Sequence, residues 1–370
     1  MMQTNEVNNN LRVLQIVPTT NWGGGERYVH DLTEAIKANG DNVFVISRKS
    51  DVIQRKFADL NLPFFTLPLL FLFDVYSILR LAFFIKKHRI NIVHSHIFCD
   101  AFLAVFAKKL IRAKSVKVVM TRHLAKRGKN NFLYRYLYKN LDPLIFVSNV
   151  VKERFFFTVS TKNIRTMVVH NAVKNVRFES IKQMDFRRIF NLETDARLLG
   201  FCGRLDFEKG VDLILDALPQ LLQHNVVLLV AGVGDKKYMD FLHQKIKDLN
   251  IENRVYFLGF VDDVLAFLAA LDVAILPSRA KEAFHLVLIE CLQVGCPVIT
   301  TNTGAQEEII ENQKTGLIIS PNSVSEIVEK TKLLLDNPEY CSEVRKNAIK
   351  ASEAFSYNAF FKTIYDLYIK

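Results

Sequence analysis

Two glutamates, Glu282 and Glu290, stand eight positions apart in a segment that could bind an anionic ligand rich in hydroxyl groups. The apolar run 273–276 predicts the end of a buried strand, and the polar residues 278–282 predict a loop. Apolar residues at helical spacing predict a helix over 286–294, which a glycine and a proline then close. Ligands of parallel α/β proteins gather where strands end and helix N-termini present unpaired N–H groups. The segment therefore predicts a site for a diphosphate, with the carboxylates binding sugar hydroxyls.

Two further segments place residues that could bind phosphate groups directly after a predicted strand. Arg204 and Lys209 follow the strand 198–202, and two cations at such a turn suit a diphosphate whose charge grows as a sugar leaves. Gly23 and Gly24 lie in a glycine loop between a strand and a helix, where backbone N–H groups can approach a phosphate. A plain tight turn explains those glycines equally well.

The length of 370 residues and the hydrophobic content of 50% predict two domains with ample cores. Residues 1–10 are polar and lack the pattern of a secretory signal, so the chain is expected in the cytoplasm. The five cysteines form no C-x-x-C pair, which favours reduced thiols and argues against a zinc site.

Positive charge is concentrated in the first half of the chain. Residues 1–175 hold 27 Lys+Arg against 11 Asp+Glu, a balance of +16, whereas the whole chain carries +11. The candidate partners of this basic half are a nucleic acid, an anionic membrane surface and a phosphorylated acceptor. The Phe-rich runs 62–73 and 75–85 are too short to span a bilayer. An interfacial amphipathic helix and a helix buried against the sheet remain alternatives for the second run.

The densest basic stretch lies between Lys108 and Lys139, where aromatic residues alternate with lysines and arginines. His94 and His96 share one face of the predicted strand 91–96, but no cysteine or carboxylate accompanies them as a metal ligand would require. His96 is nearer the end of that strand and could line an acceptor site.

Several segments resemble the retaining glycosyltransferases of family 4, which have the two-domain B-type fold. Residues 282–299, EAFHLVLIECLQVGCPVI, are similar to the family's E-x7-E signature, with Ala283 and His285 in place of two glycines. Residues 203–210 match G-R-L-x-x-x-K-G, residues 23–26 match GG-x-E, and residues 121–123 resemble T-x-H. These motifs cover both halves of the chain.

The resemblance implies roles for individual residues. The first glutamate of the signature lies by the transferred sugar and the second binds the nucleotide ribose, which places these roles on Glu282 and Glu290. The T-x-H histidine lies by the reacting sugar, a role that falls on His123. The implied catalytic set is Glu282, His123, Arg204 and Lys209. The implied donor-binding set is Gly23, Gly24, Arg204, Lys209, Gly232, Val261, Glu282, Ala283, Phe284, His285, Leu286 and Glu290. The acceptor or membrane side would contain His96, Arg122, Lys126, Arg127 and Lys129.

The resemblance also implies an α/β fold of two Rossmann-like domains facing across a cleft. Residues 1–175 would form an acceptor-binding domain, residues 176–352 a domain that binds the nucleotide sugar, and a helix over 353–370 would cross back to the first domain.

The implied reaction moves a sugar, with retention of configuration, from a nucleotide diphosphate sugar such as a UDP-sugar to a glycan. The basic first domain points to an anionic acceptor, such as a lipopolysaccharide core or a lipid-linked saccharide. It also points to peripheral contact with the cytoplasmic face of an inner membrane. No D-x-D motif is present, so neither a metal nor another cofactor is expected, and nucleic acid is not an expected partner. The rival readings are another sugar-nucleotide enzyme of this fold, such as an epimerase or a phosphorylase, and a basic nucleic-acid-binding protein.

Overall fold

The protein consists of two compact α/β units. The computed structural model describes residues 11–17, 19–160, 164–174, 181 and 184–370. The described residues up to Asn171, together with Asn358–Lys370, form the first unit, and those of Ala172–Tyr357 form the second. The boundary expected at residue 175 falls outside the described residues, as do the polar residues 1–10.

The first unit is built on a seven-stranded sheet with parallel pairing and the strand order β3-β2-β1-β4-β5-β6-β7. Its strands are short and mostly apolar, as sheets covered on both faces require. They are β1 (Arg12–Ile16), β2 (Asn42–Ser47), β3 (Phe64–Thr66), β4 (Ile92–Ser95), β5 (Lys117–Arg122), β6 (Leu144–Phe146) and β7 (Thr166–Val168).

The second unit repeats this plan with a six-stranded parallel sheet of order β10-β9-β8-β11-β12-β13. Its strands are β8 (Arg197–Cys202), β9 (Val226–Ala231), β10 (Val255–Gly259), β11 (Val273–Leu276), β12 (Val298–Thr301) and β13 (Leu317–Ile319). The order reverses between β8 and β11, which is the point where doubly wound sheets bind ligands. The sequence predicted this fold class of two Rossmann-like domains, and the two sheets confirm it.

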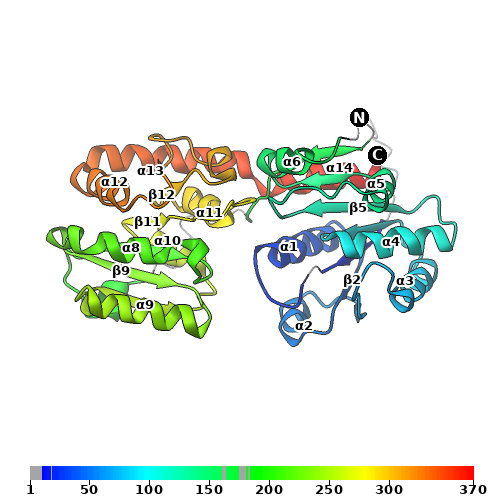
Figure 1. Ribbon diagram of the computed structural model, residues 1–370, viewed down its shortest axis with the longest axis horizontal. Coiled ribbons are helices and arrows are strands. Elements are labelled where there is room, and N and C mark those ends of the chain that lie inside the picture. The colour runs from blue at the N-terminus through cyan, green and yellow to red at the C-terminus, as the bar shows by residue number, and fades with distance from the viewer. Residues whose placement is uncertain (1–10, 18, 161–163, 175–180, 182–183) are drawn as a thin grey trace, which may run out of the picture. The chain divides into compact units, whose positions relative to one another are not determined.

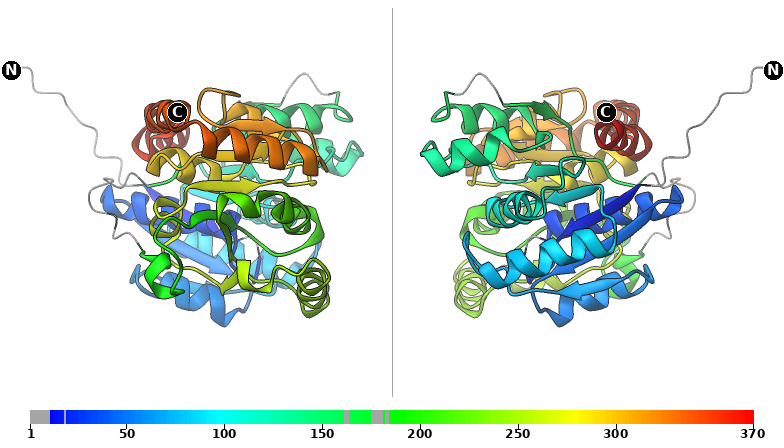
Figure 2. Two further views of the ribbon diagram at one scale, coloured as in Figure 1. Left: turned by 90° about the vertical axis from the view of Figure 1, so that its left-hand side faces the viewer. Right: turned by 90° about the vertical axis from the view of Figure 1, so that its right-hand side faces the viewer.

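Helices connect the strands and cover both sheets (Figures 1 and 2). Those of the first unit are α1 (Gly24–Ala38), α2 (Asp51–Ala58), α3 (Val75–Lys87), α4 (Phe98–Leu110), α5 (Phe132–Lys139) and α6 (Asn149–Phe156). Those of the second unit are α7 (Phe186–Ile189), α8 (Val211–Ala217), α9 (Lys236–Asp248), α10 (Val264–Ala269), α11 (Leu286–Val294), α12 (Val324–Asp336) and α13 (Pro338–Ser352). Short 3-10 turns include η2 (Phe207–Lys209), η3 (Leu218–His224), η4 (Glu252–Arg254), η5 (Ala305–Glu308) and η6 (Glu353–Phe355).

Local sequence fixes where these helices begin and end. Ser148 caps α6 by accepting a hydrogen bond from the Val151 N–H at 3.2 Å. Asp235 caps α9 in the same way, and both side chains satisfy donors that a helix N-terminus leaves open. Gly295 ends α11 in the left-handed conformation with φ 66°, which a glycine adopts at low cost.

The last helix, α14 (Tyr357–Ile369), belongs to the first unit, as the sequence predicted. The Tyr368 hydroxyl lies 2.6 Å from Nδ1 of His94 on β4. The Lys117 ammonium on β5 donates to the Tyr368 carbonyl at 2.8 Å. These contacts attach the end of the chain to the middle of the first sheet.

Among the described residues, no helix combines the length and the apolarity that crossing a membrane would need. All five cysteines lie among the described residues, and none of them forms a disulfide.

Candidate active site

The loop that follows β8 carries the predicted cations. Asp206 organises the loop by accepting a hydrogen bond from the Lys209 N–H at 3.1 Å at the start of η2. Gly210 ends the loop with φ 76°, and a Cβ there would lie 2.4 Å from the carbonyl oxygen of Pro277. Only a glycine lets this loop approach the end of β11 so closely. The match to G-R-L-x-x-x-K-G therefore has a structural reason at its last position.

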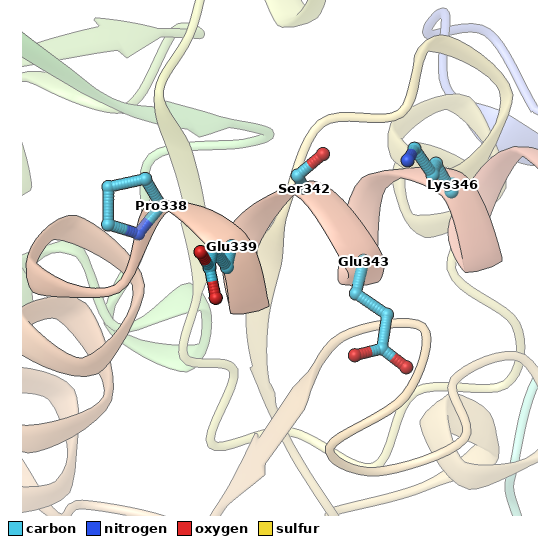
Figure 3. A pocket seen from close by; sticks show the side chains of 5 residues that line it. All are labelled: Pro338, Glu339, Ser342, Glu343 and Lys346. Carbon is cyan, nitrogen blue, oxygen red and sulfur yellow. The ribbon is translucent and has the colours of Figure 1, made fainter.

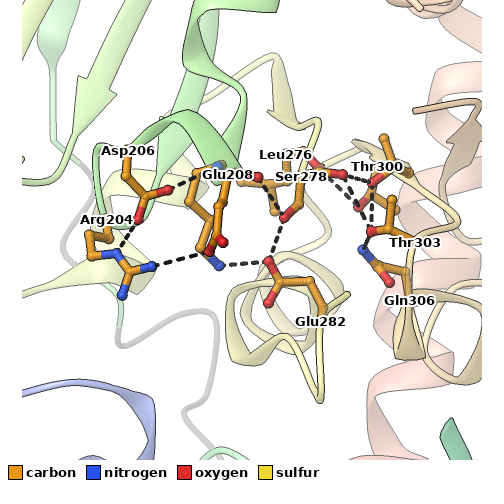
Figure 4. A network of polar contacts seen from close by, with 11 residues as sticks. Arg204, Asp206, Glu208, Leu276, Ser278, Glu282, Thr300, Thr303 and Gln306 are labelled. Atoms are coloured by element: carbon orange, nitrogen blue, oxygen red, sulfur yellow. Dashed lines mark hydrogen bonds and ion pairs between the residues drawn. The ribbon is translucent and has the colours of Figure 1, made fainter. Parts of the chain in front are cut away.

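Glu282 is held by both its side chain and its backbone. Its Oε1 accepts hydrogen bonds from the Lys209 ammonium at 2.7 Å and from the Ser278 hydroxyl at 2.6 Å (Figure 4). Its carbonyl oxygen accepts from the Ala305 N–H at 3.0 Å. A Cβ on Gly304 would lie 2.2 Å from that same carbonyl oxygen, so the loop after β12 touches the Glu282 backbone. Three loops at one edge of the sheet thus fix this carboxylate.

The charge state of Glu282 follows from these contacts. Burial alone would raise the pKa of the carboxyl, but the His285 imidazole, the Lys209 ammonium and the hydrogen bonds from Lys209 and Ser278 lower it to about 2. Burial lowers the pKa of His285 to about 4, so the imidazole is neutral at pH 7. At that pH the positive charge beside Glu282 is that of Lys209.

His285, which replaces a glycine of the family signature, is buried at the start of α11. Its Nδ1 has no hydrogen-bond partner among the described residues. A buried polar atom without a partner is costly, so this nitrogen is suited to a ligand group.

Arg204 lies on the open side of the same loop and does not contact Glu282. Its side chain is 66% exposed and pairs with Asp206 and, at 3.7 Å, with Glu208. The structure therefore brings Lys209 and Glu282 together, whereas the exposed Arg204 side chain pairs with Asp206 (Figure 4).

Arg279, in the loop after β11, connects that loop to η2 and α8, and the sequence analysis did not predict this role. Its guanidinium donates to both carboxylate oxygens of Asp212, at 2.8 and 2.7 Å, and to the Phe207 carbonyl at 2.8 Å. It also lies 4.1 Å from the centre of the Phe207 ring. Asp212 accepts a further hydrogen bond from the Tyr238 hydroxyl at 3.0 Å. Burial alone would raise the pKa of Asp212, but the contacts with Arg279 lower it.

A second set of hydroxyls and amides supports the loop from β12. The Thr301 hydroxyl donates to the Ser278 carbonyl at 2.7 Å, and the Thr303 hydroxyl donates to the same oxygen at 3.3 Å. The Gln306 amide then donates to Thr303 at 2.9 Å (Figure 4). Ser278 is thereby fixed at its carbonyl as well as at its hydroxyl.

The remaining predicted donor residues of the second unit lie around the same sheet edge. Glu290 is inside α11 and only 1% exposed. Phe284 meets Phe355 edge to face at 6.2 Å, next to Ala283 and before Leu286, the first residue of α11.

Gly232 and Val261 follow β9 and β10. A Cβ on Gly232 would lie 1.8 Å from the Gly203 carbonyl oxygen, so the turns after β8 and β9 touch through backbone alone. Val261 is partly buried against the core of the unit. The segments after β8, β9, β10 and β11 thus collect the predicted donor residues of the second unit at the carboxyl edge of its sheet.

Gly23 and Gly24 lie at the start of α1 in the first unit, Gly23 being its N-cap. The first turn also contains Glu26, a buried residue whose carboxylate accepts a hydrogen bond from the Thr19 hydroxyl at 2.7 Å. A Cβ on Gly23 would lie 3.3 Å from the other carboxylate oxygen. The strand, glycine loop and helix predicted from the sequence are present.

His94, His96 and His123 form a hydrogen-bonded cluster inside the first unit. Nδ1 of His96 lies 3.1 Å from Nε2 of His123, and Nε2 of His96 lies 3.2 Å from the amide oxygen of Gln15. Nε2 of His94 lies 2.8 Å from the Thr121 hydroxyl. The two histidines weighed as a metal pair therefore use their ring nitrogens within this cluster.

The network assigns the protons of the rings. An amide oxygen can only accept, so Nε2 of His96 carries the hydrogen and its Nδ1 accepts from Nε2–H of His123. Nδ1 of His123 is then left as a lone pair. Burial lowers the pKa of His123 to about 4 and that of His94 to about 3, and it lowers the pKa of His96 well below its usual value. All three rings are neutral at pH 7.

Arg122 differs from the expected position on the acceptor or membrane surface. It is 5% exposed, and its guanidinium lies over the rings of Phe98 at 4.9 Å and Phe155 at 5.4 Å. It donates to the carbonyls of Lys126 and, at 3.3 Å, of Arg127. Arg122 is the last residue of β5, and its buried guanidinium holds the following loop.

The other three cations of that set are exposed. Lys126 is open to solvent, Arg127 stacks on Phe157 at 4.4 Å, and Lys129 lies 5.1 Å from the centre of the Tyr134 ring.

One group within the described residues has the composition of a metal site. His30, Asp31 and Glu34 on α1 each offer a ligand atom within 4.8 Å of the others. Asp31 already pairs with Arg27 at 3.7 Å, and none of these residues is in the predicted donor set. We assign no function to this group.

An open hollow lies along α13 and is lined by Pro338, Glu339, Ser342, Glu343 and Lys346 (Figure 3). Its charged residues are of mixed sign, and it contains no residue of the predicted site. We therefore place the candidate site at the loops around Glu282.

Two family models match the chain one after the other. Residues 22–176 match "Glycosyltransferase Family 4", and residues 182–351 match "Glycosyl transferases group 1". An O-antigen biosynthesis glycosyltransferase of Escherichia coli is 28% identical over 263 residues, which cover 67% of this chain and 72% of that protein.

Solved structures share the whole fold. A glycosyltransferase of Rickettsia africae superimposes with a TM-score of 0.85 at 20% identity, covering 97% of this chain and 98% of that one. The Anabaena protein HepE in complex with UDP gives a TM-score of 0.83 at 19% identity, covering 96% of this chain and 99% of that one. The same Anabaena protein in complex with UDP-glucose gives 0.80 at 19% identity, covering 96% and 98%.

Proposed function

Because the chain belongs to the family 4 glycosyltransferases and has their B-type fold, we propose that it moves a sugar from a UDP-sugar to a glycan with retention of configuration. The observation that carries the proposal is the contact between Lys209 and Glu282 at the carboxyl edge of the second sheet. The Anabaena relative of this fold was solved with UDP and with UDP-glucose, which supports a uridine nucleotide as the donor.

The residues of the second unit have complementary roles in this proposal. Glu290 binds the ribose hydroxyls, and Arg204 and Lys209 bind the diphosphate and stabilise its charge as the sugar departs. Glu282 lies by the transferred sugar. The unpartnered Nδ1 of His285 contributes to donor selection by meeting a sugar hydroxyl.

The proposed step exchanges one bond for another on the same face of the sugar. The bond between the anomeric carbon and the diphosphate oxygen breaks, and a bond to the acceptor oxygen forms. The proton of the acceptor hydroxyl passes to the departing diphosphate. The lone pair on Nδ1 of His123 accepts a hydrogen bond from a hydroxyl of the reacting sugar and so orients it.

The acceptor in this proposal is an anionic glycan attached to a membrane, such as a lipopolysaccharide core or a lipid-linked saccharide. The E. coli relative acts in O-antigen biosynthesis, and the first 175 residues carry an excess of 16 positive charges. We place the enzyme as a peripheral protein on the cytoplasmic face of the inner membrane. No metal is required, because cationic side chains neutralise the leaving diphosphate.

The test is release of nucleoside diphosphate from a panel of nucleotide sugars, first without an acceptor and then with extracted lipid-linked saccharides. We expect slow hydrolysis of one UDP-sugar that accelerates with acceptor. Glu290→Ala should slow this release at donor concentrations below saturation, whereas Glu329→Ala, which removes an exposed glutamate of α12, should leave it unchanged. Binding of nucleic acid that falls steeply with salt, without release from any nucleotide sugar, would favour a nucleic-acid-binding protein.

A further inference from the structure

One face of α3 is apolar yet open to solvent. The helix buries Ser77, Leu81, Ala82, Phe84 and Ile85 against the unit. The opposite face exposes four large apolar side chains, which are Val75 at 64%, Tyr76 at 58%, Leu79 at 54% and Phe83 at 60%. One side of the helix therefore packs on the unit, as the buried alternative predicted, and the other side has the composition of an interfacial helix.

The exposed apolar surface continues from α3 towards α5. In the loop before α3, Phe71 is 57% and Phe73 is 52% exposed. The Phe73 ring stacks on Phe106 of α4 at 5.9 Å, and Phe106 stacks on Tyr136 of α5 at 6.4 Å. Phe132, one turn before Tyr136 on α5, is 78% exposed. Aromatic side chains thus link three helices that pack side by side.

Cations surround these apolar side chains. Exposed lysines and arginines lie on each of the three helices, namely Arg80, Lys86, Lys87, Lys109, Arg135 and Lys139. The Lys87 ammonium is 5.9 Å from the centre of the Phe83 ring, so charge and apolar surface are immediate neighbours.

Residues 60–141, which include α3, α4 and α5, contribute no exposed acidic side chain. From residue 60 to residue 141 the sequence contains only Asp74 and Asp100, and both are buried. Asp74 caps α3, and Asp100 pairs with Arg48 at 2.9 Å. The exposed charge of this stretch is therefore entirely positive.

We propose that the exposed residues of α3, α5 and the loop before α3, here called the α3–α5 face, insert into the interface of an anionic bilayer. The inference rests on the proposed peripheral membrane contact and assigns it to defined side chains. Phe83, Leu79 and Phe132 enter the acyl boundary, while the lysines and arginines meet lipid phosphates. A protein partner fits less well, since protein interfaces are depleted in lysine.

The test is sedimentation of the full chain with vesicles of phosphatidylglycerol and phosphatidylethanolamine, or of phosphatidylcholine alone, at low and high salt. We expect binding to the anionic vesicles that decreases with salt. Leu79→Ser/Phe83→Ser should weaken it at least about tenfold, because two large apolar side chains are withdrawn. Lys86→Glu/Lys87→Glu should weaken it by about 25-fold or more, at about fivefold for each cation lost.

Matched variants in the second unit test whether the loss of vesicle binding depends on where the apolar side chains and charges are removed. Ile189→Ser/Phe241→Ser also removes two exposed apolar side chains, and Lys236→Glu/Lys237→Glu makes the same change in net charge. Both should bind like the wild type. Thermal unfolding followed by circular dichroism checks that every variant is folded.

Each negative result overturns a different part of the proposal. If the α3 variants bind vesicles as well as the wild type does, the α3–α5 face is not the membrane-binding surface. Membrane contact itself would still stand if Lys126→Glu/Arg127→Glu/Lys129→Glu weakened binding. Absence of binding to both vesicles would overturn the membrane contact, and release of UDP would still test sugar transfer separately. A dimer in solution that Leu79→Ser/Phe83→Ser disperses, without vesicle binding, would assign the face to a second copy of the chain and would also overturn the proposal.

Discussion

Replacing Lys209 by methionine tests the electrostatic description of the candidate site. The ammonium of Lys209 donates to Glu282 at 2.7 Å, and the two side chains are 20% and 11% exposed. Methionine keeps much of the apolar stem and removes the charge, so a nearly buried carboxylate loses its cation. Ser278 would remain as its hydrogen-bond donor.

The expected loss of stability in Lys209→Met follows from the pKa of Glu282. Its fall from 4.5 to about 2 on folding corresponds to about 3 kcal/mol of stability at pH 7, which sets the upper limit. His285 is neutral at that pH, so Lys209 supplies the positive charge that stabilises the Glu282 carboxylate. We expect Lys209→Met to lower the free energy of unfolding by about 1.5 to 3 kcal/mol. Because the folded pKa is the lower one, this stability is complete above about pH 4.5 and is lost as the pH falls through about 2.

Urea unfolding of the wild type and the variant at several pH values between 7 and 3 measures this difference. The destabilisation should shrink as the pH falls below 4.5, because the carboxyl then protonates in the unfolded chain. Lys314→Met is the matched control, since Lys314 and Glu311 form an exposed pair at 2.9 Å that should contribute at most about 1 kcal/mol. A Lys209→Met cost no larger than the control, or a cost that does not depend on pH, would show that Lys209 does not stabilise the Glu282 carboxylate.

Three further predictions concern the proposed reaction. Glu290→Ala should weaken UDP binding by about 1.5 to 3 kcal/mol in calorimetry, because hydrogen bonds to the ribose are lost; unchanged affinity would contradict the assignment. Arg204→Ala should lower kcat about a hundredfold or more while the unfolding temperature stays near that of the wild type, since this side chain is 66% exposed. Near-normal turnover of that variant, or loss of wild-type activity with EDTA, would show that the leaving group is neutralised by other means. Nitrogen NMR should find His123 protonated at Nε2 in the wild type and as a mixture of tautomers in Gln15→Leu, which removes the acceptor that fixes the His96 ring; protonation of His123 at Nδ1 in the wild type would reject the proton assignment.

The sequence predicted those parts of the fold whose signal is local. Buried parallel strands are short apolar runs, and the limits of β11 agree with the predicted run 273–276. The helix α11 ends at Gly295, where a glycine and a proline marked its end in the sequence. The sequence also predicted the turn that contains Lys209 after β8, from a motif whose last glycine the structure shows to be required by the close approach to Pro277.

The contacts that hold the site could not be predicted because they join distant residues without any periodic pattern. Arg279 and Asp212 lie 67 positions apart, and nothing local indicates their ion pair. The hydrogen bonds between His96, His123 and Gln15 depend on the order of β1, β4 and β5 in the sheet.

The burial of Arg122 could not be predicted for a related reason. Its neighbours in the sequence are basic and exposed, but two aromatic rings from α4 and α6 enclose its guanidinium. Likewise, the hydropathy of α3 did not reveal that one apolar face stays open to solvent, because burial depends on what packs against the helix.

Proton NMR of the reaction with the UDP-sugar that the panel identifies, in the presence of an acceptor glycan, shows both the bond that forms and its configuration. We expect one UDP released for each new glycosidic bond, and an anomeric signal of the product with the same configuration as the donor. An inverted anomeric signal would contradict retention. Formation of a different UDP-sugar or of a sugar phosphate, without any new glycosidic bond, would contradict sugar transfer itself.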